Sequence, residues 1–303
     1  MPEWLDPRLS LGGLIAGIIV GLTGMGGAAL VTPMLLLFGV PATSAVSSDV
    51  VASAFMKPVG SLVHIRARTV HWRLVWWLSA GSVPGVLVGT WIFSRAVQEG
   101  AAAAEATVKL WIGVVLLIAV ATMVVRAIIN SRMPRRDIAV ELMGVETPVR
   151  ILPTVILGAL VGLLVGMTSV GSGSLVVTAL LLLYPMLRPS ILVGTDITQA
   201  VPMLVAGAIA HAGIGDVAWG VTASLLIGQI PGVWMGARLS SRYDGHALRW
   251  LLMVILVATG LRLLGVSSLA CALIAIAGVA VVGTIMIRQK LAARGTSEAT
   301  PMQ

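Results

Sequence analysis

Hydrophobic positions run almost without interruption along this chain, in stretches too long for a single membrane helix. Residues 9–48 carry no formal charge, and neither do residues 151–187. At about 1.5 Å per residue, a straight helix of forty residues would measure roughly 60 Å, whereas bilayer hydrocarbon is about 30 Å thick. We therefore expect both runs to break midway, at the glycine-rich turns of residues 24–27 and 170–173. Glycines at every fourth position before each turn are expected to let helices pack closely.

Seven other charge-poor segments have the length of membrane-crossing helices. They are residues 43–65, 74–94, 107–127, 190–211, 217–237, 250–265 and 267–287. The period-two alternation typical of strands is absent from them. The sequence thus predicts an all-α polytopic membrane protein.

The composition supports a protein that lies in a membrane. Hydrophobic residues make up 58% of the chain and charged residues 11%, and the mean hydropathy is +1.01. A soluble globule of 303 residues needs more polar surface than this. The lipid bilayer is therefore the first expected partner.

The net charge of +8 raises the question of a nucleic-acid partner. The arginines, however, lie in short segments between hydrophobic spans, as in cytoplasmic loops of membrane proteins. They cluster after residues 43–65 and within residues 128–149, whereas residues 211–220 carry only Asp216. We expect no nucleic-acid partner, an external N-terminus and a cytoplasmic C-terminus.

This orientation is consistent if each long uncharged run is a re-entrant hairpin that does not cross the membrane; single kinked spans are the open alternative. Each half then crosses three times, and an odd number of crossings inverts the second half. The predicted units are a first repeat, a cytoplasmic linker, an inverted second repeat, an extra helix and a disordered tail: residues 9–127, 128–149, 150–266, 267–288 and 289–303.

The two halves repeat the same glycine and polar residues in the same order. An offset of 145 relates Gly13 to Gly158, and beyond a two-residue insertion near Pro185 the offset is 147. Residues related in this way are called equivalent below. Such coincidences in one register favour a duplication. The polar equivalents include Asp49 and Asp196, His64 and His211, and Trp72 and Trp219.

Inverted repeats with broken helices suit a transporter, because two related halves can rock around a site between them. Freed amides at a helix N-terminus favour an anion. We expect a small anion to bind at the two breaks, and hydroxyl or amide donors to assist it. Backbone satisfaction within the broken helix is the alternative role of those hydroxyls. The candidate residues are Gly24, Gly26, Gly27, Ser169, Gly171, Ser172, Gly173, Thr198 and Gln199.

These motifs resemble a known family. The sequence GLTGMGG at residues 21–27 precedes Pro33 and an aliphatic run, has a degenerate copy in the second half, and is accompanied by Pro-Gly-Val in both halves. The pattern resembles the TauE/SafE sulfite exporter family over about residues 10–287. The resemblance implies transport, with export the expected direction, of sulfite, organosulfonates or related sulfur-containing anions across the bacterial inner membrane. Ser169, Ser172 and Lys57 depart from the family's usual pattern.

Lys57 is a candidate for the anion ligand. It is expected about eight residues, roughly 12 Å, from the cytoplasmic end of its span, where an ammonium group is costly without a partner. Snorkelling to the interface, or a structural pair with Asp49, is the alternative. The equivalent residue is Leu204, so this charge makes the two halves unequal.

The paired acidic and histidine residues are candidates for proton coupling. Asp49 and Asp196 can carry protons between the two sides of the membrane; their alternative role is helix capping or a hydrogen bond to the re-entrant tip. His64 and His211 are expected near water at the ends of their spans, where they can relay protons or anchor the interface. No cluster with metal-ligand spacing surrounds them, so no metal site is predicted.

Two other functions compete with transport. An intramembrane aspartyl protease would use Asp49 and Asp196, and a non-transporting membrane scaffold would use the helices alone. No Walker loop, zinc-protease motif or nucleophile elbow is present, so no enzyme activity and no cofactor are expected. The single Cys271 allows no intramolecular disulfide. Whether the protein forms a homodimer stays open.

Overall fold

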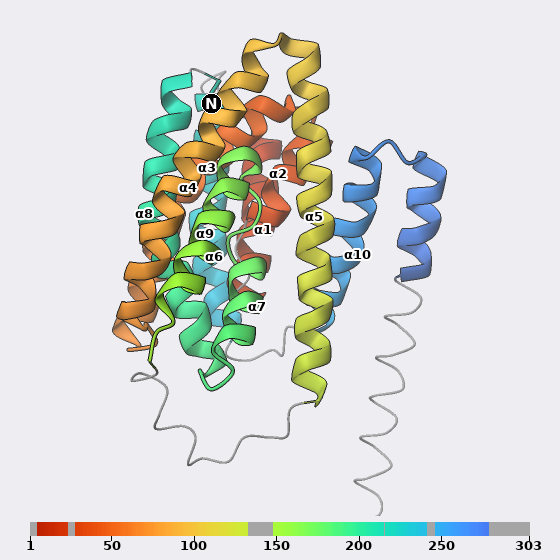
Figure 1. The fold of residues 1–303 in the computed structure, drawn as a ribbon. Helices are drawn as coiled ribbons and strands as arrows, with labels where there is room; N and C mark the ends of the chain where they lie inside the picture. Colours follow the sequence, from red (N-terminus) through yellow and green to blue (C-terminus); the bar gives the residue numbers. More distant parts are fainter. Residues whose placement is uncertain (1–4, 24–27, 133–147, 215, 241–245, 279–303) are drawn as a thin grey trace, which may run out of the picture.

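The structure of the protein is a computed structural model, and it describes residues 5–23, 28–132, 148–214, 216–240 and 246–278. These residues form helices joined by short connections, with no strand among them (Figure 1). The helices of the first half are α1 (Pro7–Thr23), α2 (Ala28–Leu37), α3 (Ala42–Arg66), α4 (Trp72–Gln98) and α5 (Ala101–Arg132). Those of the second half are α6 (Ile151–Thr168), α7 (Ser174–Leu183), α8 (Pro189–Ile214), α9 (Trp219–Ser240) and α10 (His246–Leu263), followed by a helix over Ser268–Gly278.

Each predicted span is helical over most of its described residues; the helices within 217–237, 250–265 and 267–287 begin at Trp219, end at Leu263 and begin at Ser268, respectively. The span expected at 107–127 is longer than predicted, because α5 continues to Arg132 and so takes up the start of the expected linker. The rest of that linker from residue 133 to 147, and the tail expected at 289–303, lie outside the described residues. Among the described residues, four helices are long and apolar enough to cross a membrane: Trp72–Gln98, Ala101–Ile129, Ile151–Thr168 and Ser190–Ile214.

The second uncharged run breaks where the sequence predicted. Helix α6 ends at Thr168, and Ser169 follows in the left-handed conformation with φ 59°. Gly171 and Gly173 have φ values of 129° and 112°, which L side chains rarely adopt. These glycines therefore allow the chain to turn into α7. The corresponding turn of the first run, residues 24–27, lies outside the described residues.

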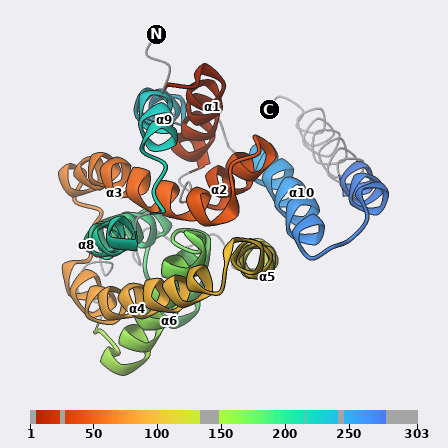
Figure 2. The same cartoon turned by 90° about the horizontal axis from the view of Figure 1, so that it is seen from above.

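Two helix pairs between the halves organise the bundle. Helix α1 packs along α9, and α6 packs along α4, while α3 and α8 lie between these pairs (Figure 2). Helix α10 lies to one side, against α5. Each close pair thus joins an element of one half to an element of the other.

The close pairs depend on glycine, as the sequence predicted. A Cβ atom at Gly81 of α4 would collide with the carbonyl oxygen of Val155 on α6, and one at Gly228 of α9 with that of Ser10 on α1. Gly81 and Gly228 are equivalent, and so are Ser10 and Val155. The same reciprocity holds further along both helix pairs. On α4, Gly85 meets Ala159 of α6 and Gly89 meets Leu163. On α9, the equivalent glycines Gly232 and Gly236 meet Leu14 and Ile18 of α1, which are equivalent to Ala159 and Leu163.

Two hydrogen bonds between the halves are also reciprocal: each joins a backbone N–H just before α9 or α4 to a hydroxyl group of α3 or α8. The backbone N–H of Ala218 donates to Ser48 Oγ at 3.1 Å, and that of His71 donates to Thr195 Oγ1 at 3.0 Å. The two donors are equivalent residues, and so are the two acceptors. The duplicated sequence therefore makes duplicated tertiary contacts.

Candidate functional site

Lys57 is a buried cation in the middle of α3. Its side chain is 4% exposed, and its Nζ atom has no hydrogen-bond partner. Among the described residues, no carboxylate oxygen lies within 4.0 Å of that atom. The ammonium group is attracted by Asp196 on α8 and, less strongly, by Asp49 on its own helix. The alternative of snorkelling to the interface is wrong, because the group is enclosed. A direct salt bridge to Asp49 is also absent.

Asp196 belongs to a polar chain that links α8 to α4 and to the break of the second half. Gln199 Nε2 donates to Asp196 Oδ1 at 3.4 Å, and Ser82 Oγ donates to Gln199 Oε1 at 3.2 Å. The backbone amide of Gly173, just before α7, also interacts with the Asp196 carboxylate. The second oxygen, Oδ2, is buried without a hydrogen-bond partner. Asp196 therefore has unused acceptor capacity beside Lys57.

The N-terminus of α7 adds donors to this region. Ser172 is 3% exposed, and its hydroxyl group has no hydrogen-bond partner. Gly173 precedes the first turn of α7, where backbone N–H groups and the helix dipole favour negative charge. These residues belong to one half of the predicted anion site, which stays a prediction, while Gly24, Gly26 and Gly27 of the other half lie outside the described residues.

Asp49 lies in a different environment, although it is equivalent to Asp196. Thr32 Oγ1 donates to Asp49 Oδ2 at 2.7 Å, Ser169 Oγ to the same oxygen at 2.9 Å, and Ser53 Oγ to Oδ1 at 3.5 Å. No hydrogen bond joins Asp49 to Asp196, whereas an aspartyl protease dyad holds one proton between two carboxylates. The hydroxyl of Ser169 is thus used by Asp49.

The two histidines differ more than their equivalence suggested. His211 is fully buried: Nδ1 pairs with Ser47 Oγ at 3.0 Å, Nε2 with the carbonyl oxygen of Gly166 at 3.0 Å, and the ring lies 4.9 Å from that of Phe93. The expectation that His211 lies near water is wrong, because the packing of α4 and α6 covers that end of α8. His64 is only partly buried and pairs with Thr69 Oγ1 at 2.9 Å. Ser47 is equivalent to Gly194, which has no hydroxyl for His64.

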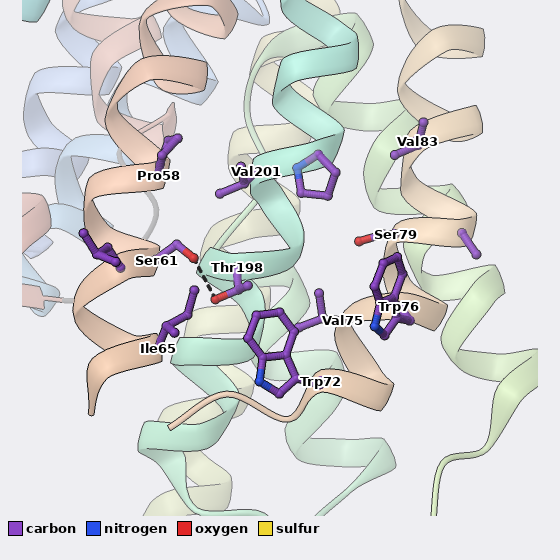
Figure 3. A pocket seen from close by; sticks show the side chains of 13 residues that line it. Pro58, Ser61, Ile65, Trp72, Val75, Trp76, Ser79, Val83, Thr198 and Val201 are labelled. Carbon is purple, nitrogen blue, oxygen red and sulfur yellow. Dashed lines mark hydrogen bonds between the residues drawn. The ribbon is translucent and has the colours of Figure 1, made fainter. Parts of the chain in front are cut away.

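A cavity of about 670 Å³ lies between α3, α4 and α8 (Figure 3). Trp72 and Trp76 line it on α4, and Ser61 donates to Thr198 Oγ1 at 3.0 Å across its α3–α8 wall. Its lining includes Pro58, the residue next to Lys57. On α3 the lining thus runs from Pro58 to Ile65, close to the loop of residues 67–71. Thr198 lines the cavity, whereas the next residue, Gln199, is hydrogen-bonded to Asp196.

Several polar residues of the site were missed by sequence reasoning. Thr32, Ser53, Ser82 and Gln229 are all buried, and the first three bond to groups of the site. Gln229 is equivalent to Ser82, but both polar atoms of its amide lack a hydrogen-bond partner. Polar residues at equivalent positions of the repeat were the only signal that could have found this pair.

The comparisons with known proteins identify the family of the chain. The model of the family described as "Sulfite exporter TauE/SafE" matches residues 9–263. The chain belongs to the TauE/SafE family. Its similarity to the "Probable membrane transporter protein YjnA" of Bacillus subtilis (strain 168) is 35% identity over 263 residues, which cover 86% of this chain and 100% of that protein.

Two further proteins of Bacillus subtilis (strain 168) are similar to this chain along most of their length. The "Probable membrane transporter protein YunE" is 22% identical and the "Probable membrane transporter protein YdhB" 25% identical, over 83% and 82% of this chain and 94% and 96% of theirs. No solved structure matches the chain. The family match, the relatives and the apolar helices together indicate a multi-pass membrane transporter of the TauE/SafE family.

Proposed function

We propose that this protein is a secondary transporter that exports small sulfur-containing oxyanions, such as sulfite or organosulfonates, across the bacterial inner membrane. The observation that carries the proposal is the ammonium group of Lys57, which is buried without a hydrogen-bond partner. A buried charge is costly unless a partner of opposite charge offsets its desolvation. An oxyanion supplies acceptors to that group, and the family's description names sulfite.

The groups around Lys57 would complete the anion site. The hydroxyl of Ser172 and the amides at the start of α7 are donors, and Gln199 and Thr198 lie on the facing side of α8. Asp196 occupies the same donor region in this conformation. An entering anion therefore competes with the Asp196 carboxylate, and a proton on Asp196 removes that competition.

Alternating access around this site follows if the two halves are inverted repeats with re-entrant hairpins. Two observations support that arrangement: equivalent glycines make reciprocal contacts between the halves, and equivalent N–H groups bond to equivalent hydroxyls. The two ends of α3 and α8 nevertheless differ. The end near His211 is closed by buried hydrogen bonds, whereas the end near His64 adjoins the cavity. The opposite conformation would exchange these two environments.

The direction of transport rests on the position of the cavity. It adjoins the loop of residues 67–71, and the arginines around that loop favour a cytoplasmic location. An anion from the cytoplasm would thus enter past Ser61 and Thr198 and reach Lys57. The N-terminus would then be external and the C-terminus cytoplasmic.

Proton coupling is assigned to Asp196 rather than to Asp49. One oxygen of Asp196 has no hydrogen-bond partner, so it can accept a proton without breaking an existing hydrogen bond. Asp49, in contrast, accepts hydrogen bonds from three hydroxyl groups, so both of its oxygens already have partners. His64, at the cavity end, can pass protons between Asp196 and water, while His211 does so only after its buried hydrogen bonds open.

The test is sulfite flux in proteoliposomes that contain the purified full chain. The variant Lys57→Leu carries the residue of the equivalent position, Leu204, which is itself 1% exposed. We expect this variant to fold and to lose flux and sulfite binding. Lys109→Ala removes a cation that pairs with Glu105 outside the site and should transport normally. Normal flux in Lys57→Leu would remove Lys57 from the site. Taurine, sulfoacetate, thiosulfate and sulfate, as competitors, would then define the anion class.

A further inference from the structure

The two equivalent aspartates differ in what surrounds them, and the difference is built into the sequence. Three hydroxyl groups from three separate segments converge on Asp49: Thr32 from α2, Ser53 from α3 and Ser169 from the break. None of the three recurs around Asp196. The equivalent residues are Val177, Ala200 and Gly24, respectively. The hydroxyl cage therefore belongs to Asp49 alone and is no consequence of the duplication.

The broken helix presents opposite poles to the two aspartates. Asp49 meets Ser169, the residue that follows the end of α6, whereas Asp196 meets Gly173, the residue before α7. A helix C-terminus carries partial negative charge and favours cations, while an N-terminus favours anions. The Asp49 side of the break is thus suited to a cation, and the α7 side to an anion.

We propose that Asp49, Thr32, Ser53 and Ser169 form a sodium site. The carboxylate supplies the charge, and the three hydroxyl groups can rotate to turn lone pairs toward the ion. Every atom that would bind the ion is a hard oxygen, which suits a main-group cation. A single carboxylate among these ligands suits a monovalent cation. Carbonyl groups of a broken helix are known to complete sodium sites in transporters, and Ser169 lies at such a break. Within the described residues, no cluster of His, Cys, Asp and Glu offers a transition-metal site.

If the protein transports an anion, as proposed above, a sodium ion at this site would also balance charge in the core. Lys57, Asp49 and Asp196 are the formally charged residues that are buried among those described, and their charges sum to −1. When an anion binds near Lys57 and Asp196 carries a proton, as proposed above, the sum is again −1 in a medium of low dielectric constant. A sodium ion at Asp49 neutralises that charge, so the two ions favour each other's binding.

The site is tested by thermal unfolding of the purified full chain in detergent, in sodium, potassium or choline chloride at equal ionic strength and without a substrate anion. A ligand that binds only the folded state raises the melting temperature. We expect sodium, but not choline, to do so, with potassium weaker. Thr32→Val and Ser169→Gly introduce the equivalent residues, and glycine accepts the φ of 59° at residue 169. Each should raise the half-effective sodium concentration at least about tenfold.

The matched control is Thr178→Val, which removes a buried hydroxyl group of α7 that bonds to the carbonyl oxygen of Thr122 and not to Asp49. It should keep the sodium response of the wild type. Equal stability in sodium and choline, or an unchanged sodium response in both Thr32→Val and Ser169→Gly, overturns the site. Sulfite flux in vesicles separates the two proposals. Flux without any sodium response refutes the sodium site alone, whereas a sodium response without binding or flux of any sulfur anion refutes the proposed substrate alone.

Discussion

Ser169 donates a hydrogen bond of 2.9 Å to Asp49, across 120 residues of sequence, and so ties the helix break of the second half to α3 of the first. Both residues are fully buried. A carboxylate that accepts a buried hydroxyl donor makes a charge-assisted hydrogen bond, which is stronger than a neutral one. The break and α3 must therefore move together, or this bond must open when the transporter changes conformation.

The first prediction compares two serines that flank Gly171. Ser169→Ala removes a buried donor from Asp49 and should lower the free energy of unfolding by about 1.5–3 kcal/mol. Ser172→Ala removes a hydroxyl that has no hydrogen-bond partner and should change it by less than about 0.5 kcal/mol. Thermal unfolding in detergent measures both. Equal destabilisation by the two substitutions would contradict the Ser169–Asp49 bond.

The second prediction concerns the close packing of α4 on α6. The Cβ of Gly81→Ala would collide with the carbonyl oxygen of Val155, so the helices must separate. We expect a loss of about 1–3 kcal/mol or more, or a fall in the yield of folded protein. Gly213→Ala, on α8, meets no atom within 4 Å and is the control. Size-exclusion chromatography and thermal unfolding report the result, and an unaffected Gly81→Ala protein would show that these helices are further apart.

The third prediction separates the equivalent histidines. His211→Ala removes a ring with two buried hydrogen bonds and a contact to Phe93, whereas His64 is only partly buried. Loss of the buried His211 ring creates a cavity and leaves Ser47 without its partner. His211→Ala should therefore lower the melting temperature by several degrees more than His64→Ala. Comparable melting temperatures of the two variants would argue that His211 is as accessible as His64.

The fourth prediction tests the role of Asp196 in proton coupling. Wild-type sulfite flux should rise when the membrane carries a pH gradient and fall when an ionophore collapses it. Asp196→Asn cannot exchange a proton, so its remaining flux should be insensitive to the gradient. Proteoliposomes with a set internal pH give the measurement. Wild-type flux that is independent of the pH gradient would identify a uniporter. Gradient-dependent flux in Asp196→Asn would show that a group other than Asp196 carries the proton.

Much of the fold could be predicted because lipid leaves the backbone few choices. Uncharged runs longer than the bilayer had to break, and Gly171 and Gly173 mark one of the breaks with positive φ values. The glycines of α1, α4, α6 and α9 recur at helical spacing because two backbones meet there. These features are local or periodic, and so they are visible in one sequence.

The candidate site was only partly predictable. Lys57 could be named, because a cation within an apolar span needs a reason. The partners of Asp49 could not, because Thr32 and Ser169 lie 17 and 120 residues away and are common residue types. The burial of His211 was missed for the same reason, since Phe93 and Gly166 reach it from other helices.

Membrane residence, the glycine-marked break of the second half and the equivalence of the two halves could all be read from the order of residues, since they follow from segment length, charge and repetition. The different surroundings of the equivalent residues Asp49 and Asp196 could not be predicted from the sequence. They depend on which pole of a broken helix each carboxylate meets, and on whether Thr32 and Ser169, or Lys57 and Gln199, lie nearest to it. Those neighbours are brought together by packing between the halves. Equivalent residues in the sequence thus acquire unequal chemistry in the folded protein.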